Sequence, residues 1–448
     1  MLIRRLTSAA TAIWAYGLAA AVILVAIAVV VWLGLPPRVV VMTTGAPGSD
    51  YEALGVRYRA VLQRAGLELR LLPSAGAVEN LQRLSDAKSG VMVGFAQGGL
   101  TNEAQSPNLT SLGTLFFEPL WFFTRVPPGS IRLEGLRGKK IAIGQPGSGT
   151  RVLSGRIMAL NGIAPSFAEF QSLSTLQAGE ALVHGDIDAA LMIASWESPV
   201  VHRLLASADV TLLSFPRADA YVALNPYLTV LRLPAGVGDL AMNRPPSDVD
   251  VIAPKASLIV RRDLHPAIQY LLLEAAAEIH SAPNIFQKFG QFPAIERGDF
   301  PLSEHAQQFH KTGTPLLQRY LPFWLAVFVS RLLLVLIPAA ALAYPVLNVL
   351  PSLTSWNVKR RILQLYGELR LIEADLEQSG GVTTSGMLAR LQRWEQRAHR
   401  LRVPVELVPV LYSLRTHIAL LRDRTASAQV AASAAERVST PSHAVTRA

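Results

Sequence analysis

Residues 38–72 read RVVVMTTGAPGSDYEALGVRYRAVLQRAGLELRLL, and this stretch decides the fold. The apolar run at 38–42 has the length of a buried strand, 51–65 has the apolar spacing of a helix, and 68–72 is a second strand-like run. A strand, a helix and a strand in this order are typical of a parallel βαβ unit. The stretch therefore predicts an α/β fold, in which ligands bind beyond the carboxyl ends of the strands.

The same alternation continues along the chain. Further helices are expected at 77–86, 151–160 and 266–280, and further strands at 91–95, 140–144 and 189–193. Such alternation indicates a mostly parallel sheet with helices on both faces. Because the region between residues 38 and 319 exceeds the usual size of one domain, we expect two α/β lobes.

Two stretches without a charged residue, Leu6–Pro37 and Leu332–Val358, flank this region. Each is long enough for a transmembrane helix, which needs about 20 apolar residues. Basic residues precede the first stretch and follow the second, and basic residues stay on the cytoplasmic side. We expect a cytoplasmic N-terminus at 1–11, an anchor at 12–35, an outer domain at 38–319, a second transmembrane helix at 321–350, a cytoplasmic helical region at 352–425 and a disordered tail at 426–448.

Three features of the flanking segments refine this topology. The apolar part of the first span is longer than the 7–15 residues of a signal peptide, and no Ala-x-Ala site precedes Arg38, which favours an uncleaved anchor. Arg331 lies either at the outer interface, with its stem along the helix, or within the membrane beside a partner. Heptad-like apolar positions at 362–376 and a second helix at 388–401, separated by a turn, predict a helical hairpin in the tail.

The charge distribution excludes a nucleic-acid partner. The net charge of +10 suggests such a partner, but the outer domain carries 25 basic and 24 acidic residues, and the tail from Ser352 carries 14 basic and 8 acidic residues. The excess lies beside the cytoplasmic membrane face, where anionic lipids attract it. The lipid bilayer is therefore the partner that this charge indicates.

The chain shows no pattern of an enzyme, a metal site or a cofactor site. It contains no cysteine, which excludes disulfides and thiol catalysis, and its histidines are scattered singly. The run Gly147-Ser148-Gly149-Thr150 has neither the lysine of a P-loop nor the spacing of a dinucleotide fingerprint. We therefore expect a binding protein without catalytic residues, cofactor or metal.

Polar, glycine-rich segments follow four expected strands. Backbone N–H groups beside short hydroxyls and amides hold a carboxylate without an ion pair. Alone, each segment is as consistent with an ordinary turn, but four at successive strand ends favour a binding site. The candidate ligand-binding residues are Thr43, Thr44, Tyr51, Ser74, Asn80, Gln97, Ser148, Gly149, Thr150 and Arg151. Trp196, like Phe116 and Trp121, either lines the cleft or belongs to the core.

Residues 38–314 resemble the solute-binding subunits of tripartite ATP-independent periplasmic (TRAP) transporters of the TAXI group. The resemblance rests on Thr43-Thr44-Gly45, on Ser74–Leu81, on Val93–Gln97, on Leu136–Gly144 and on Gly147-Ser148-Gly149-Thr150, and it extends to Leu233–Gly236, Asp239-Leu240 and Leu317–Ala326, which look like the membrane-tethered members. These segments are ordered along about two thirds of the chain.

The resemblance implies a type II periplasmic-binding-protein fold, with a hinge crossed twice and lobes at 38–122 with 225–312 and at 123–224. It also implies a bacterial inner-membrane location with the main domain in the periplasm, a TRAP-type permease as partner, and a small carboxylate ligand such as glutamate or 2-oxoglutarate. One departure is Asp50, which brings a negative charge to the cleft mouth, where Arg151 could offset it. The alternative function is a transmembrane sensor that signals through the cytoplasmic helices.

Overall fold

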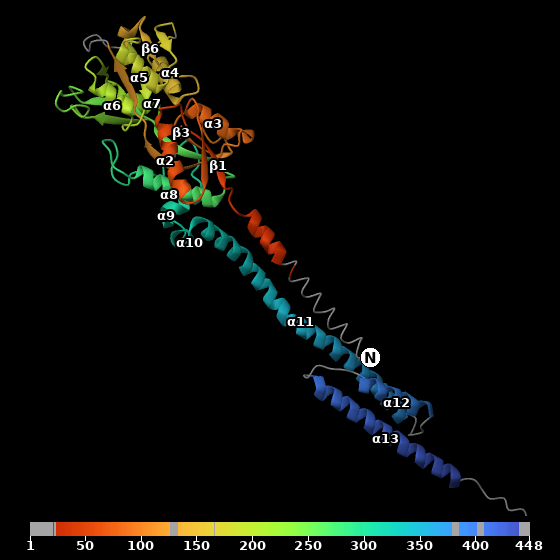
Figure 1. Cartoon of the computed structure of the whole chain (residues 1–448). Helices are drawn as coiled ribbons and strands as arrows, with labels where there is room; N and C mark the ends of the chain where they lie inside the picture. The colour runs from red at the N-terminus through yellow and green to blue at the C-terminus, as the bar shows by residue number, and fades with distance from the viewer. Residues whose placement is uncertain are drawn as a thin grey trace, which may run out of the picture. The chain divides into compact units, whose positions relative to one another are not determined.

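The computed structural model describes residues 21, 24–125, 133–164, 166–296, 298–378, 385–400 and 407–438. It divides into two compact units, Met1–Leu333 and Leu334–Ala448. The first unit contains two β-sheets, and both lie within residues 38–319 (Figure 1). The second unit is helical.

The first sheet has five strands in the order β2-β1-β3-β12-β4. Strand β1 runs parallel to β2 and β3, whereas β12 runs antiparallel to β3 and β4. Helices α2 and α3 pack on this sheet, and α8 packs on α2. The elements are β1 (Val39–Thr43), α2 (Asp50–Arg64), β2 (Glu68–Leu72), α3 (Ala77–Ser85), η1 (Ala87–Ser89), β3 (Val93–Gln97), β4 (Leu109–Phe117), β12 (Lys255–Arg261), α8 (Pro266–His280), α9 (Glu304–Thr312) and α10 (Leu316–Tyr320).

The second sheet has seven strands, six of them in the order β10-β11-β5-β8-β6-β7, with β9 paired to β5. Strand β6 is parallel to β7 and β8, and β5 is antiparallel to β8, β9 and β11. The elements are β5 (Leu120–Thr124), η3 (Leu133–Leu136), β6 (Lys140–Ala142), α4 (Gly149–Leu160), β7 (Glu169–Gln171), α5 (Thr175–His184), β8 (Ala189–Ile193), α6 (Pro199–Ala206), β9 (Thr211–Leu212), α7 (Ala218–Leu224), β10 (Thr229–Leu233) and β11 (Val249–Ala253).

Each lobe has its own hydrophobic core. In lobe 1, Tyr58 and Leu62 of α2 pack with Phe95 of β3 and Leu272 of α8, all fully buried. In lobe 2, the sheet is covered on two faces, because Trp121 and Phe123 of β5 belong to one cluster while the adjacent Phe122 belongs to another. Successive side chains of a strand point to opposite faces, so this alternation is what a sheet between two layers requires.

Every strand and helix expected at residues 38–95, 140–160, 189–193 and 266–280 is confirmed, with ends shifted by at most two residues. The prediction of mostly parallel sheets is wrong, since β12 and β5 run antiparallel to their neighbours in the two sheets. The chain crosses between the sheets at 118–119 and again at Pro254, so lobe 2 extends through β10 and β11. These two strands are an antiparallel pair, and a βα pattern does not reveal such a pair.

One segment of the described chain is long and apolar enough to cross a membrane. It is Phe323–Ala341, with a mean hydropathy of 2.2, at the start of α11 (Phe323–Gln378). The apolar helix Leu24–Leu33 is shorter, and much of the first expected span lies outside the described residues. Arg331 lies beside a partner, with its Nη2 atom 3.0 Å from Nε2 of His265.

The second unit forms a small helical core. It contains the rest of α11, α12 (Ser385–Arg400) and α13 (Val408–Val438). Ile362, Leu391 and Leu414, one from each helix, are fully buried together, and Trp394 packs with them. Helix α13 continues to Val438, into the segment expected to be disordered, and residues 439–448 lie outside the described part.

Candidate functional site

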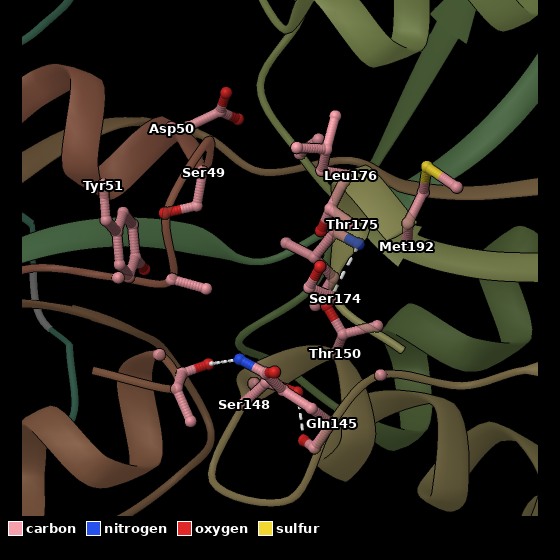
Figure 2. A pocket seen from close by; sticks show the side chains of 18 of the residues that line it. Ser49, Asp50, Tyr51, Gln145, Ser148, Thr150, Ser174, Thr175, Leu176 and Met192 are labelled. Atoms are coloured by element: carbon pink, nitrogen blue, oxygen red, sulfur yellow. Dashed lines mark hydrogen bonds between the residues drawn. The ribbon is translucent and has the colours of Figure 1, made fainter. Parts of the chain in front are cut away.

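A cavity of about 80 Å³ lies between the two lobes (Figure 2). Figure 2 shows Tyr51 of lobe 1 on one side and Thr150, Ser174 and Thr175 of lobe 2 facing it from the other. One water molecule needs about 10–15 Å³ of cavity volume measured in this way, so the cavity has room for a small organic solute. It lies beyond the carboxyl ends of β1, β6 and β8, where ligands bind in α/β folds.

Five helices begin at this cavity. The residues that line it include the first positions of α2, α3, α4 and α5 and the N-cap Ser198 of α6, and each of these helices has at least eight residues. The first N–H groups of a helix have no partner within the helix, and the helix dipole places partial positive charge there. The cavity wall therefore favours an anionic group without presenting a cationic side chain.

The turn before α4 shows how the sequence builds one of these ends. The Ser148 hydroxyl donates to the Gln145 carbonyl at 2.7 Å and accepts the Arg151 N–H at 3.2 Å, so it caps the helix. Gly144 and Gly147 have φ angles of +89° and +86°, a conformation that side chains oppose. The Thr150 hydroxyl accepts the Ile193 N–H at 3.2 Å and ties α4 to β8.

Gly149 marks the closest approach of the two lobes. A Cβ atom at this position would lie 2.0 Å from Oε1 of Gln97, which belongs to β3 in lobe 1. Gln97 is 6% exposed and lines the cavity. Its side-chain amide has no hydrogen-bond partner among the described residues, so it is available to a solute.

Several hydrogen bonds cross the cleft. The Gln145 amide donates to the Ala75 carbonyl at 3.1 Å, and the Glu79 N–H donates to the Gly147 carbonyl at 3.2 Å. The Ser195 N–H donates to the Asp50 carboxylate. These bonds join lobe 1 to lobe 2 beside the cavity, so the structure is a closed form of the cleft.

Two carboxyl groups line the lobe 1 side. Glu118, on the first crossing between the sheets, is 4% exposed and accepts a hydrogen bond from the Tyr51 hydroxyl at 3.0 Å. Burial raises the pKa of Glu118 to about 8, with a further increase from the nearby Asp50 and a decrease from the Tyr51 hydrogen bond. Burial raises the pKa of Asp50 to about 6, against the lowering effect of the Ser195 N–H. Both groups hold their protons at a higher pH than ordinary carboxyl groups.

The structure brings five of the eleven expected site residues to the cavity: Tyr51, Gln97, Ser148, Gly149 and Thr150. Four other expected residues do not line it: Thr43, Thr44, Ser74 and Asn80. They form a buried hydrogen-bond network inside lobe 1, in which the Asn80 side-chain amide bonds the Thr43 and Ser74 hydroxyls and the Thr44 carbonyl. Arg151 donates to the Ser172 hydroxyl at 3.2 Å and lies outside the lining. Trp196 packs against His202 and Phe286, again outside it, and Phe116 and Trp121 are buried core residues.

Other lining residues were not expected from the sequence. Glu118 is the most consequential, and Ser174, Thr175 and Ser198 also line the cavity. Ser174 carries a detectable signal, because Ser-Thr-Leu-Gln at 174–177 is a capping box that the structure contains. The described residues contain no group of three or more His, Asp or Glu side chains that could hold a metal ion.

A second cavity of about 340 Å³ lies beside β3 and β12. Its charged groups are already paired. The Lys255 ammonium lies 2.6 Å from Glu296, and the Asp299 carboxylate accepts the Gly99 N–H at 2.6 Å. The smaller cavity has the helix N-termini and the unpaired polar groups, so it is the candidate site.

Two α/β lobes with a small polar cavity between them form a fold of the periplasmic-binding-protein type. The chain belongs to the NMT1-like family, which matches residues 42–312.

Solved structures with a similar fold include three bacterial proteins. One from Bordetella bronchiseptica RB50 is 20% identical, with a TM-score of 0.38, over 54% of this chain and 70% of that chain. The periplasmic aliphatic sulphonate-binding protein of Escherichia coli is 15% identical, with a TM-score of 0.33, over 54% and 72% of the two chains. The alkanesulfonate-binding protein of Xanthomonas axonopodis pv. citri, bound to MOPS, is 17% identical, with a TM-score of 0.35, over 55% and 73%.

Proposed function

We propose that this protein is a membrane-tethered solute receptor of a TAXI-type TRAP transport system, and that it closes its lobes on a small carboxylate. It is a binding protein and not an enzyme. The observation that carries the proposal is the closed cavity at which five helices begin. Helix N-termini bind carboxylates through N–H groups and the dipole, without an ion pair. Of the expected residues, Tyr51, Gln97, Ser148, Gly149 and Thr150 are the proposed ligand-binding set.

The proposal includes two membrane spans with both termini in the cytoplasm. The apolar segment Phe323–Ala341 supports the second span, and the basic residues Lys359, Arg360 and Arg361 beyond it support a cytoplasmic tail. The helix Leu24–Leu33 supports the first span more weakly, because it is short. The two α/β lobes, which contain the cavity, then face the periplasm. Two helices are too few for a transport path, so a separate permease is the proposed partner.

A thermal-shift screen tests the ligand proposal. The full chain in detergent is heated with glutamate, 2-oxoglutarate and small mono- and dicarboxylates, and unfolding is followed by tryptophan fluorescence. A ligand at 100 times its dissociation constant stabilises the folded form by about 2.7 kcal/mol. A shift for at least one carboxylate, lost on a change of Thr150 to Val, is the expected result. No shift with any of them would contradict the carboxylate proposal.

A transmembrane sensor is the second candidate. The observation in its favour is the buried core of Ile362, Leu391 and Leu414 in the second unit, which a solute receptor does not need. Deletion of Lys359–Ala448 separates the two functions. Unchanged solute uptake with lost solute-dependent regulation favours the sensor, and lost uptake with intact regulation favours the transport role.

A further inference from the structure

The lobe 1 wall of the cavity has unused capacity to bind a hydrogen-bond donor. Glu118 is buried and lines the cavity, and its Oε2 atom accepts one hydrogen bond, from Tyr51. Its Oε1 atom has no hydrogen-bond partner among the described residues. The amide of Gln97, also buried at the cavity, is likewise unpaired within the described structure. Neither group is among the described side-chain atoms that are both fully buried and unpaired, so both reach the open space of the cavity, where a solute can supply the missing partner.

The cavity has acidic side chains without basic ones. Of the described residues that line it, Asp50 and Glu118 carry carboxyl groups, and none is Lys, Arg or His. Arg151, the cation expected to offset Asp50, bonds Ser172 outside the lining. Asp50 already accepts the Ser195 N–H across the cleft. Glu118 is therefore the carboxyl group with free capacity for a solute.

We infer that Glu118 is the counter-ion for an ammonium group of the solute, so that the site takes small amino acids in preference to carboxylates without an amine. This inference rests on the proposed function, because the solute carboxylate goes to the helix N-termini and its ammonium to Glu118. The two ends of a zwitterion match the two walls of the cavity. A dicarboxylate such as 2-oxoglutarate has no ammonium group to pair with ionised Glu118, and it could only accept a hydrogen bond from the protonated form.

Proton exchange is a consequence of this assignment. The groups near Glu118 are Tyr51 and Asp50 of α2, while Lys255, next to the second crossing, is paired with Glu296. With its pKa raised to about 8 by burial, Glu118 is protonated in the empty cavity at neutral pH. An ammonium group binds the ionised carboxylate, so the proton leaves as the amino acid binds.

Matched pairs of probes test the inference on the full chain in detergent. L-alanine is compared with L-lactate, and L-glutamate with 2-hydroxyglutarate, because each pair differs only in an amine and a hydroxyl. We expect the amino acid of at least one pair to bind about tenfold or more tightly than its hydroxy acid, the discrimination that an unmatched buried polar group can give. Glu118→Gln should reduce that ratio to about threefold or less, whereas Glu180→Gln, on the exposed face of α5, should preserve it.

Calorimetry in two buffers of different ionisation enthalpy gives an independent readout on the wild-type chain. At pH 7, amino acid binding should release close to one proton, hydroxy acid binding close to none, and Glu118→Gln should abolish the release. Equal affinities within the pairs, or a ratio and proton release that survive in Glu118→Gln, would overturn the inference while leaving carboxylate binding intact. Failure of all four probes to bind while another carboxylate of the thermal-shift screen binds would overturn the inference alone, and failure of every carboxylate would contradict the proposed function as well.

Discussion

Asn80 uses its whole side-chain amide inside lobe 1. Its Oδ1 atom accepts from the Thr43 and Ser74 hydroxyls, each at 2.7 Å, and its Nδ2 atom donates to the Thr44 and Phe95 carbonyls at 2.7 and 2.9 Å. The residue is fully buried. It therefore holds the ends of β1 and β3 and the turn after β2 together, and it shapes the cavity wall only indirectly.

We expect Asn80→Ala to lower the free energy of unfolding by about 2–4 kcal/mol, because several buried polar groups lose their partner at once. The measurement is the thermal midpoint of the full chain in detergent. Gln82→Ala, on the exposed face of the same helix, is the control and should change stability by less than about 0.5 kcal/mol. A loss of solute affinity with an unchanged midpoint would instead place Asn80 in direct contact with the solute.

Gly149→Ala should weaken solute binding without unfolding the protein. The added Cβ atom would meet the Gln97 amide at 2.0 Å, so that amide must move, and the closed form becomes less favourable. We expect about a tenfold loss of affinity in calorimetry with the best ligand from the screen, which corresponds to about 1.4 kcal/mol. Gly155→Ala on the same helix meets open space and should bind like the wild type. Equal affinities of the two variants would contradict the close approach at Gly149.

The site residues that the sequence could predict are those whose local pattern shows their role. Ser148, Gly149 and Thr150 follow a strand and begin a helix, so spacing alone puts them at a strand end. Glu118 stands in the apolar run LFFEPLWFF, where no local feature marks it, and its hydrogen-bond partner Tyr51 is 67 positions away. Thr43 and Asn80 have the residue types of a binding site, but Thr43 bonds the Asn80 side chain and Asn80 bonds two backbone carbonyls that only the folded lobe brings near.

At the scale of elements, His265 is the N-cap of α8. Its Nδ1 atom accepts the Ala267 N–H at 3.2 Å, so the neutral ring carries its proton on Nε2, which lies 3.1 Å from the Gly34 carbonyl. Burial lowers the pKa of His265, and the nearby Arg331 lowers it further, against the raising effect of the Gly34 carbonyl. The neutral His265 ring thus lies beside Gly34, the residue after the apolar helix Leu24–Leu33, and beside Arg331 of the candidate span Phe323–Ala341.

We expect His265→Ala to lower the free energy of unfolding by about 1 kcal/mol through loss of the cap, a decrease of about 2–4 °C in the thermal midpoint. His265→Asn should recover most of this loss, because asparagine is among the best N-caps. Thermal unfolding of the full chain in detergent at neutral pH measures both. A midpoint for the Asn variant as low as that of the Ala variant would show that the hydrogen bond from Nε2 to the Gly34 carbonyl, rather than the cap, stabilises this region.

Element types were predictable where an apolar period is local, which is why β1, β2, α2 and α8 matched their expected ranges. Strand direction was not, because β12 joins the first sheet from more than 150 residues beyond β3. Its direction and neighbours depend on the two crossings, which are set by packing rather than by any local pattern. The extent of lobe 2 was missed for the same reason.

At the scale of the whole molecule, the buried titratable groups oppose one another. Burial lowers the pKa of His280 to about 3, so unfolding takes up a proton and stability falls as the pH drops below about 6.5. The raised pKa values of Asp50 and Glu118 have the opposite effect, because the folded chain keeps protons that the unfolded chain has lost. Between about pH 4 and 6.5 these effects offset each other in part.

Above pH 6.5 the contribution of Glu118 remains, since its folded pKa is about 8 against an ordinary value of 4.5. The unfolded chain binds fewer protons than the folded chain in this range, so stability must fall as the pH rises. A full proton corresponds to about 1.4 kcal/mol per pH unit, which predicts a loss of roughly 2 kcal/mol between pH 6.5 and 8.

Thermal midpoints of the solute-free chain in detergent, recorded between pH 6.5 and 8, measure this loss of stability. Glu118→Gln, which cannot ionise, should remove most of this fall, whereas Glu180→Gln should retain it. The same fall in the Glu118→Gln variant would mean that Glu118 is already ionised in the empty cavity.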